Sequence, residues 1–320
     1  MSHELSVAIL LPCYNEEGAI GETVIAFKSA LPNATVYVYD NNSTDGTVTE
    51  AISSGAHVYK EERQGKGKVV RRMFSDVDAD VYLMADGDNT YDAAAAPLLV
   101  KELISNNLDM VVGTRTMSLE AYPKGHILGN KLFTKLISMF FGTKLNDVFS
   151  GYRVMSKRFV KTVPIFSHGF EIETELTVHA LHHSMSIKEV PTDYKSRPEG
   201  TSSKLKTFSD GAKILNFIFF LLRDVKPLQF FSTIAAISML MCLTLGLPVV
   251  AEFWRTGLVE RLPTAVLSSA LGVIAISCLF SGFILDNISR LRVEAKILHY
   301  LSYNASKNSG IYCNDEERRG

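Results

Sequence analysis

The chain lacks several features that would assign it to common protein classes. Its 33 basic and 34 acidic residues leave a formal net charge of -1, so no overall positive field favours nucleic acid binding. It has only four cysteines, widely spaced and without a Cys-x-x-Cys pair, which excludes a disulfide framework and a cysteine zinc site and fits a reducing compartment. Residues 1–4 carry neither a basic region nor an apolar run, so we expect no cleaved signal peptide.

Residues 1–115 also lack a Gly-x-Gly-x-x-Gly motif after their first apolar run, which excludes a dinucleotide-binding domain. They contain instead short apolar runs that alternate with helical patterns. This alternation predicts an α/β domain with a mostly parallel sheet covered on both faces. The predicted strands are residues 7–11, 35–39, 56–59, 80–85 and 110–113. Polar clusters follow the first, second, fourth and fifth of them, and such clusters converge at one edge of a parallel sheet.

Asp86 and Asp88 follow the fourth predicted strand, with Gly87 between them. Two carboxylates at the carboxyl end of a buried strand suit Mg²⁺ or Mn²⁺, which proteins bind through one or two carboxylates together with substrate phosphates. The alternative interpretation is a solvated Asp-Gly turn. The Asp-x-Asp pattern by itself does not decide between the two.

A glycine- and lysine-rich segment, residues 65–68, opens the helix before that strand. Glycines between lysines at a helix start bring backbone N–H groups and ammonium charge to a phosphate. An exposed basic turn explains the same residues equally well.

Four motifs follow one another along the first part of the chain. They are Leu11-Pro12-Cys13-Tyr14-Asn15-Glu16, Asp40-Asn41-Asn42-Ser43-Thr44-Asp45-Gly46-Thr47, Gly65-Lys66-Gly67 and Asp86-Gly87-Asp88. In this order and spacing they resemble the nucleotide-sugar domain of family 2 glycosyltransferases, which has the Rossmann-like GT-A fold. The resemblance covers residues 5–205.

The resemblance implies that the first two motifs hold the base and ribose, and that Asp86 and Asp88 hold a divalent metal and the diphosphate. Many family members have two aspartates where this chain has Asp40-Asn41. An asparagine oxygen still accepts a hydrogen bond from a uracil or guanine N–H group, so nucleotide binding is expected while the base stays open. The nucleotide-sugar-binding residues implied are Pro12, Tyr14, Glu16, Asp40, Asn41, Lys66, Asp86 and Arg115.

Residues 147–153, Asp-Val-Phe-Ser-Gly-Tyr-Arg, resemble a segment of the polyprenyl-phosphate glycosyltransferases, such as dolichyl-phosphate mannose synthase and the bactoprenol glucosyltransferases. The resemblance implies that Asp147 lies beside the acceptor as the candidate base and that Arg153 binds phosphate or acceptor. A phosphate monoester with a second pKa of about 6 is already largely ionised at neutral pH, so Asp147 could instead orient the acceptor. A third interpretation is an aspartate that caps the turn before Ser150.

Residues 194–205 form a basic segment that resembles the family's Arg…Gly-x-Ser-Lys-Leu region. Arg197, Ser203 and Lys204 are its candidates for clamping the donor diphosphate or the lipid phosphate, because arginine offers a planar fork and lysine a point charge. Asp88, Asp147 and Arg197 are the candidate catalytic residues.

A later predicted helix begins near Glu171, Glu173 and Glu175, where acidic side chains are favourable without any functional role. It continues through three histidines at helical spacing, residues 179–183. We expect these histidines to pack or face solvent, because no matching carboxylate motif accompanies them.

Two long apolar runs, residues 228–251 and 263–285, carry no formal charge. At ~1.5 Å per residue, each helix can cross a hydrocarbon core of about 30 Å, so we expect a transmembrane hairpin. Lysines and arginines flank the hairpin on both outer sides. The positive-inside rule therefore places the catalytic domain and both termini in the cytoplasm, at the cytoplasmic membrane.

The predicted organisation has four parts. A GT-A domain (1–206) is followed by a juxtamembrane interfacial helix (207–227), whose aromatic and aliphatic residues suit the headgroup level. The hairpin (228–286) and a cytoplasmic amphipathic, polar tail (287–320) complete the chain.

These features predict an inverting transfer of sugar from a nucleoside diphosphate sugar to a polyprenyl phosphate, such as undecaprenyl phosphate, in cell-envelope polysaccharide synthesis. The resemblance favours UDP-glucose or another UDP-hexose with Mg²⁺ or Mn²⁺, and a homo-oligomer such as a tetramer. The alternatives are a GDP-mannose-dependent mannose synthase, a processive polysaccharide synthase, and an inactive membrane scaffold or transport partner. The single tryptophan, Trp254, lies between the apolar runs and not in the Gln-x-x-Arg-Trp motif of the processive enzymes.

Overall fold

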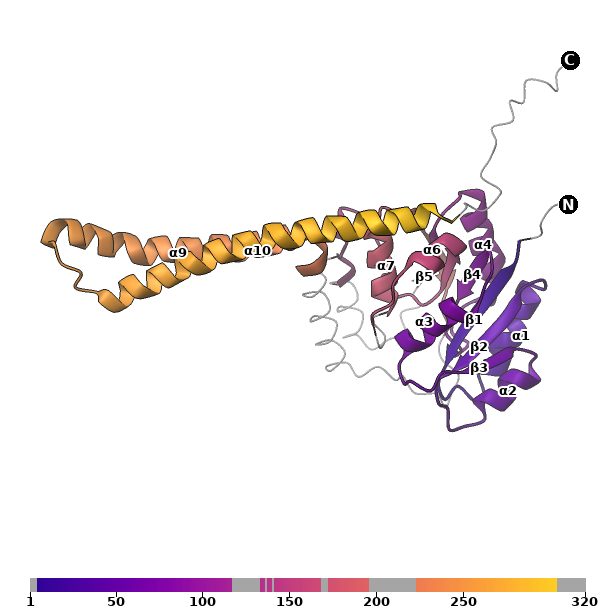
Figure 1. Cartoon of the computed structure of the whole chain (residues 1–320). Helices are drawn as coiled ribbons and strands as arrows, with labels where there is room; N and C mark the ends of the chain where they lie inside the picture. Colours follow the sequence, from indigo (N-terminus) through magenta and orange to yellow (C-terminus); the bar gives the residue numbers. More distant parts are fainter. Residues whose placement is uncertain are drawn as a thin grey trace, which may run out of the picture. The chain divides into compact units, whose positions relative to one another are not determined.

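The computed structural model describes residues 5–116, 133–135, 137–139, 141–167, 172–195 and 223–303 (Figure 1). The chain divides into two units. One unit contains residues 1–207 and 298–320, and the other contains residues 208–297. Arg197, Ser203, Lys204 and most of the predicted interfacial helix lie outside the described residues.

The first unit is built on one sheet, which has seven strands among the described residues, in the order β3-β2-β1-β4-β6-β5-β7. Every neighbouring pair is parallel except the two pairs that β6 forms with β4 and β5. The mostly parallel sheet predicted from the sequence is therefore confirmed, and β6 is an addition. The strands are β1 (Val7–Cys13), β2 (Thr35–Asp40), β3 (His57–Lys60), β4 (Val81–Met84), β5 (Met110–Thr116), β6 (Arg153–Ser156) and β7 (Ile187–Asp193).

Helices cover both faces of this sheet (Figure 1). Side chains alternate between the faces along a strand, so Ile9 and Leu11 pack into one core while Ala8 and Leu10 pack into the other. The Ile9 core takes in α1 and α4, and the Leu10 core takes in α3, α6 and α7. The helices are α1 (Ile20–Ala30), α2 (Thr47–Ser53), α3 (Lys66–Asp76), the 3₁₀ turn η1 (Ala93–Ala95), α4 (Ala96–Ser105), α6 (Lys157–Thr162) and α7 (Ile172–His182).

Two helices are long and apolar enough to cross a membrane, α9 (Pro227–Thr256) and α10 (Leu262–Leu301). All of α9 and all but the last four residues of α10 belong to the second unit. They include both predicted spans, and α10 continues past the predicted end of the second. The two helices meet at small side chains: Ser268 Oγ donates to the carbonyl of Cys242 at 3.0 Å. A Cβ added at Gly246 would collide with Ser268 Oγ, so glycine permits this close approach.

Candidate active site

The carboxyl ends of β1, β2 and β4 bring three of the four motifs to one edge of the sheet. Cys13 and Asp40 are paired across β1 and β2, and the N–H of Ala85 donates to Leu10 as β4 ends. Gly87 must be glycine, because a Cβ there would collide with the sulfur of Cys13. The loops after β1 and β4 are therefore packed against each other.

The loops after β1 and β2 are joined by hydrogen bonds from polar side chains. Asn15 Oδ1 accepts from the N–H of Thr44 at 2.9 Å, and the N–H of Asn15 donates to Ser43 Oγ at 2.9 Å. The N–H of Glu16 donates to Thr47 Oγ1 at 2.9 Å. These bonds fix the two loops predicted to hold the base and ribose into one structure.

The nucleotide-binding candidates of these loops differ in exposure. Pro12, Glu16 and Asp40 are buried, whereas Tyr14 is exposed. Both oxygens of Asp40 accept from the N–H of Ser43 at 3.2 Å. Asp40 is thus held rigidly at the end of β2, and Tyr14 is the side chain of this group that is open to a ligand.

Lys66 lies between two carboxylates, one of which is a metal-binding candidate. Its Nζ is 2.5 Å from Asp86 Oδ1 and 2.6 Å from Glu173 Oε1. Burial alone would lower the pKa of the Lys66 ammonium, but the charges of Asp86 and Glu173 outweigh burial and raise the pKa above its ordinary value. Lys66 is therefore a fixed positive charge at this edge of the sheet.

The donor set suits a divalent cation that also binds phosphate. Asp88 is buried, and its Oδ1 accepts from the Thr90 hydroxyl at 2.6 Å, whereas the Asp86 side chain stays partly exposed. Within the described residues no group of three or more His, Cys, Asp or Glu side chains could hold a metal. A pair of carboxylates matches Mg²⁺, which keeps several waters and takes its other ligands from substrate phosphates.

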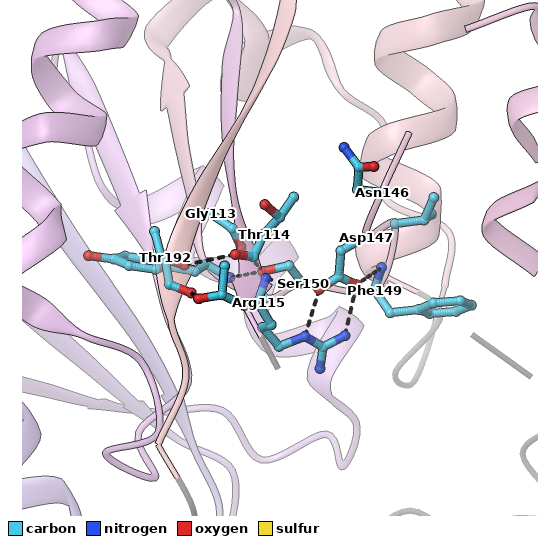
Figure 2. Close-up of polar contacts among 12 residues, drawn as sticks. Gly113, Thr114, Arg115, Asn146, Asp147, Phe149, Ser150 and Thr192 are labelled. Carbon is cyan, nitrogen blue, oxygen red and sulfur yellow. Dashed lines mark hydrogen bonds and ion pairs between the residues drawn. The ribbon is translucent and has the colours of Figure 1, made fainter. Parts of the chain in front are cut away.

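Asp147 forms a two-point ion pair with Arg115, at the end of β5 (Figure 2). Arg115 Nε is 2.7 Å from Asp147 Oδ2, its terminal nitrogen is 2.8 Å from Oδ1, and both side chains are only 8% exposed. The N–H of Phe149 also donates to Oδ1, at 3.2 Å. The Asp147 carboxylate is thus held in one orientation by a cation and by its own turn.

Arg153 is fully buried at the start of β6. Its Nε donates to the carbonyl of Ser150 at 2.9 Å and a terminal nitrogen donates to the carbonyl of Val148 at 2.8 Å. Burial lowers the pKa of Arg153 to about 10, so the side chain is still charged at neutral pH. It has no exposed surface for a phosphate in this structure, and we therefore treat it as the residue that shapes the turn carrying Asp147.

Gly151 brings this turn against the metal-binding candidates. A Cβ at Gly151 would lie 3.1 Å from Asp86 Oδ2 and 3.2 Å from the hydroxyl of Tyr91. The N–H of Gly151 donates to that hydroxyl at 2.8 Å. The segment that resembles the acceptor-binding region therefore lies close beside the aspartate predicted to bind the metal, with no room for a side chain between them.

The model of the family described as glycosyl transferase family 2 matches residues 8–163. Glycosyltransferase AglJ of Haloferax volcanii is 31% identical over 292 residues, which cover 90% of this chain and 95% of that relative. The chain belongs to glycosyltransferase family 2.

Two further comparisons add to this result. The dolichyl-phosphate hexose transferase of Haloferax volcanii is 29% identical over 65% of this chain and 90% of its own length. The crystal structure of glucosyl-3-phosphoglycerate synthase from Mycobacterium tuberculosis with Mn²⁺ and UDP-glucose has a TM-score of 0.56 at 18% identity, covering 68% of this chain and 79% of that one. The structural likeness confirms the GT-A fold of this family 2 glycosyltransferase.

Two residues of this glycosyltransferase site were not among the sequence candidates. Glu173, which holds Lys66, was interpreted as an ordinary acidic residue of a helix start, and it lies 107 positions from its partner. Glu189 of β7 accepts from the N–H groups of Asn146 and Asp147 at 3.0 and 3.2 Å. No motif marks either glutamate, because each acts through a partner that only the fold brings near.

Proposed function

We propose that this family 2 glycosyltransferase moves a sugar from a nucleoside diphosphate to a polyprenyl phosphate at the cytoplasmic membrane face, with inversion at the anomeric carbon. The observation that carries the proposal is the closeness of Gly151 to Asp86, where even one added methyl group would lie 3.1 Å from the carboxylate. It joins the acceptor-like segment to the edge that holds Asp86, Asp88 and Lys66. The bond between the anomeric carbon and the diphosphate breaks as a lipid phosphate oxygen bonds to that carbon from the opposite side.

Asp86 and Asp88 would hold Mg²⁺ or Mn²⁺ on the donor diphosphate. A bound cation supplies neutralisation of the charge that develops on the leaving diphosphate. Lys66 adds a second positive charge beside Asp86, at the edge where that negative charge develops. The loops of Tyr14, Glu16 and Asp40 bind the nucleoside.

In this proposal Asp147 orients the Arg115 guanidinium and does not act as a base. Its two oxygens already accept from Arg115, and a lipid phosphate is largely ionised near neutral pH since its second pKa is about 6. Asp147 therefore aims the Arg115 guanidinium at the place where acceptor and donor phosphates meet. Arg197, Ser203 and Lys204 complete the phosphate site in the proposal.

Two observations support a lipid acceptor. One relative, which this chain matches over 90% of that relative's length, is named a dolichyl-phosphate hexose transferase. The chain also has two helices that are long and apolar enough to cross a membrane. Tethering an enzyme to the bilayer raises the effective concentration of an acceptor that is confined to the same surface. The basic residues outside the helices favour a cytoplasmic catalytic domain and cytoplasmic termini.

UDP-glucose or another UDP-hexose is the proposed donor, with GDP-mannose as the alternative. The experiment uses the full-length protein in vesicles that contain undecaprenyl phosphate, supplied with Mn²⁺ and a panel of radiolabelled UDP- and GDP-sugars. We expect label in the lipid phase with one donor. Absence of lipid-phase label with every donor refutes the acceptor class.

The same assay tests the metal ligands. Asp86→Asn removes a carboxylate from the pair, and we expect transfer to fall by about 100-fold or more. Asp78→Asn, at an exposed carboxylate paired with Lys157, is the matched control and keeps full activity. An unchanged rate in Asp86→Asn contradicts the assignment of the metal site.

A further inference from the structure

The side chain of Asn41 forms its hydrogen bonds with the segment that leads into α3. Its Nδ2 donates to the carbonyls of Glu61 and Arg63 at 2.9 and 3.0 Å, and its Oδ1 accepts from the N–H of Gly65 at 2.7 Å. The residue is only 4% exposed. Both of its N–H donors and its oxygen therefore face the protein.

The bonding pattern requires an amide at this position. Two carbonyl acceptors on one side and one N–H donor on the other fix which end of Asn41 is nitrogen. An aspartate would keep the bond from Gly65 but would place a charged oxygen against the carbonyls of Glu61 and Arg63. Such a buried acceptor without donors is costly, so in this chain the position favours asparagine over aspartate.

The segment held by Asn41 carries the positive charge of the site. Gly65 has φ 131° and ψ 131°, a conformation that side chains rarely adopt, and it caps α3 directly before Lys66. Gly67 packs so closely on the carbonyl of Ser167 that a Cβ there would collide with it. The position of Lys66 beside Asp86 thus depends on how the turn before it is held.

We propose that Asn41 is a positioning residue for the diphosphate-binding turn and does not read the nucleotide base. The inference rests on the proposed nucleotide-sugar site. It replaces the expectation that the Asn41 oxygen accepts from uracil or guanine, because that oxygen accepts from Gly65. Selection between bases then falls to the loops of Tyr14 and Asp40.

The test measures binding of UDP, GDP and UMP to the full-length protein in detergent with Mn²⁺. In Asn41→Asp the turn shifts, so we expect UDP and GDP to bind about 10-fold more weakly, by the same factor, while UMP changes by less than about 2-fold. In the transfer assay the KM for the donor rises and the KM for the lipid phosphate does not. Asn106→Asp, at an exposed amide that ends α4, is the control and changes none of these values.

A second variant covers the case in which Asn41→Asp does not fold. Gly65→Ala strains the same turn through its φ angle, and we expect the same loss for both diphosphates with UMP retained. A change in the ratio of UDP to GDP affinity, or an equal loss for UMP, overturns the role of Asn41. If the unaltered protein binds neither UDP nor GDP, the proposed function itself is refuted and the inference falls with it.

Discussion

The two halves of the active edge are held together by different kinds of interaction. The donor-side loops (residues 12–18, 40–47 and 61–65) are joined mostly by bonds between side chains and backbone, such as those of Asn15 and Asn41. The acceptor-side segment (residues 146–153, with Arg115 and Glu189) also contains a buried ion pair, which joins Asp147 to Arg115.

This difference suits two tasks. Many hydrogen bonds between side chains and backbone hold the donor-side loops in one shape, which fits a preformed nucleotide site. A buried ion pair is different, because removing one partner leaves an uncompensated charge, and an arriving anion can compete for the cation. On the acceptor side, charge and stability are therefore coupled through this buried pair.

The largest expected effect comes from breaking the acceptor-side pair. Asp147→Ala leaves the Arg115 guanidinium buried without its carboxylate, so we expect the free energy of unfolding to fall by about 3 kcal/mol. Chemical denaturation of the purified protein measures this change. The double variant Asp147→Leu/Arg115→Met replaces the pair by apolar groups and is expected to recover most of the stability but no transfer activity. Similar losses in the single and double variants would mean that the unpaired Arg115 charge is not the cause of the lost stability.

Close packing on the donor side is tested at Gly87. Gly87→Ala forces a methyl group onto the sulfur of Cys13, and we expect a loss of about 2 kcal/mol in the free energy of unfolding. Cys13→Ala in the same chain opens that space and should recover part of the loss. Thermal unfolding of the two variants makes the comparison, and no recovery would place the strain elsewhere.

The bridge between the halves is tested at Glu173. Glu173→Gln removes one of the two carboxylates at Lys66, so the ammonium bonds more strongly to Asp86 and competes with a metal there. We expect the Mn²⁺ concentration for half-maximal transfer to rise about 10-fold, the low end of the effects seen for residues that support a metal site. The control is Glu62→Gln at an exposed side chain, which should leave the Mn²⁺ dependence unchanged.

The smallest effect concerns the carboxylate of Glu61 on the donor side. Hydrogen bonds from the Arg63 side chain lower the pKa of Glu61 from 4.5 to about 2. A lowered pKa stabilises the folded state above pH 4.5, and this contribution disappears as the pH falls toward 2. Because Arg63 is largely exposed, we expect less than about 1 kcal/mol. The difference in unfolding free energy between the unaltered protein and Glu61→Gln should shrink across this pH range, and a constant difference would contradict the assignment.

The sequence predicts the donor side better than the acceptor side, and the reason is physical. The strands that end at residues 13, 40 and 84 are apolar runs followed by polar motifs, so both the sheet and its active edge can be inferred from local pattern. The strand β6 begins with Arg153, a residue type that is rarely buried, and was not predicted.

Contacts between residues that are far apart in the sequence could not be predicted from local sequence patterns either. Arg115 and Asp147 were each predicted as site residues, but their pairing across 32 positions depends on how β5 and β6 align. Arg153 was predicted to bind phosphate or the acceptor, but its buried guanidinium donates to the carbonyls of Ser150 and Val148 in the turn before it. Asn41 shows the same limit, since its bonding partners 20 to 24 positions away decide what its amide does.

The reversed direction of β6 determines which segment of the chain lies at the active edge. At this edge, each parallel strand ends and is followed by a loop. The antiparallel strand β6 begins there instead, so the segment before it, Asp147 to Tyr152, lies at the edge. The chain that leaves β5 and the chain that enters β6 therefore meet at this edge, where Arg115 pairs with Asp147. A change in the residues that enter β6 is therefore expected to alter this half of the edge, while β1, β2 and β4 keep their own register.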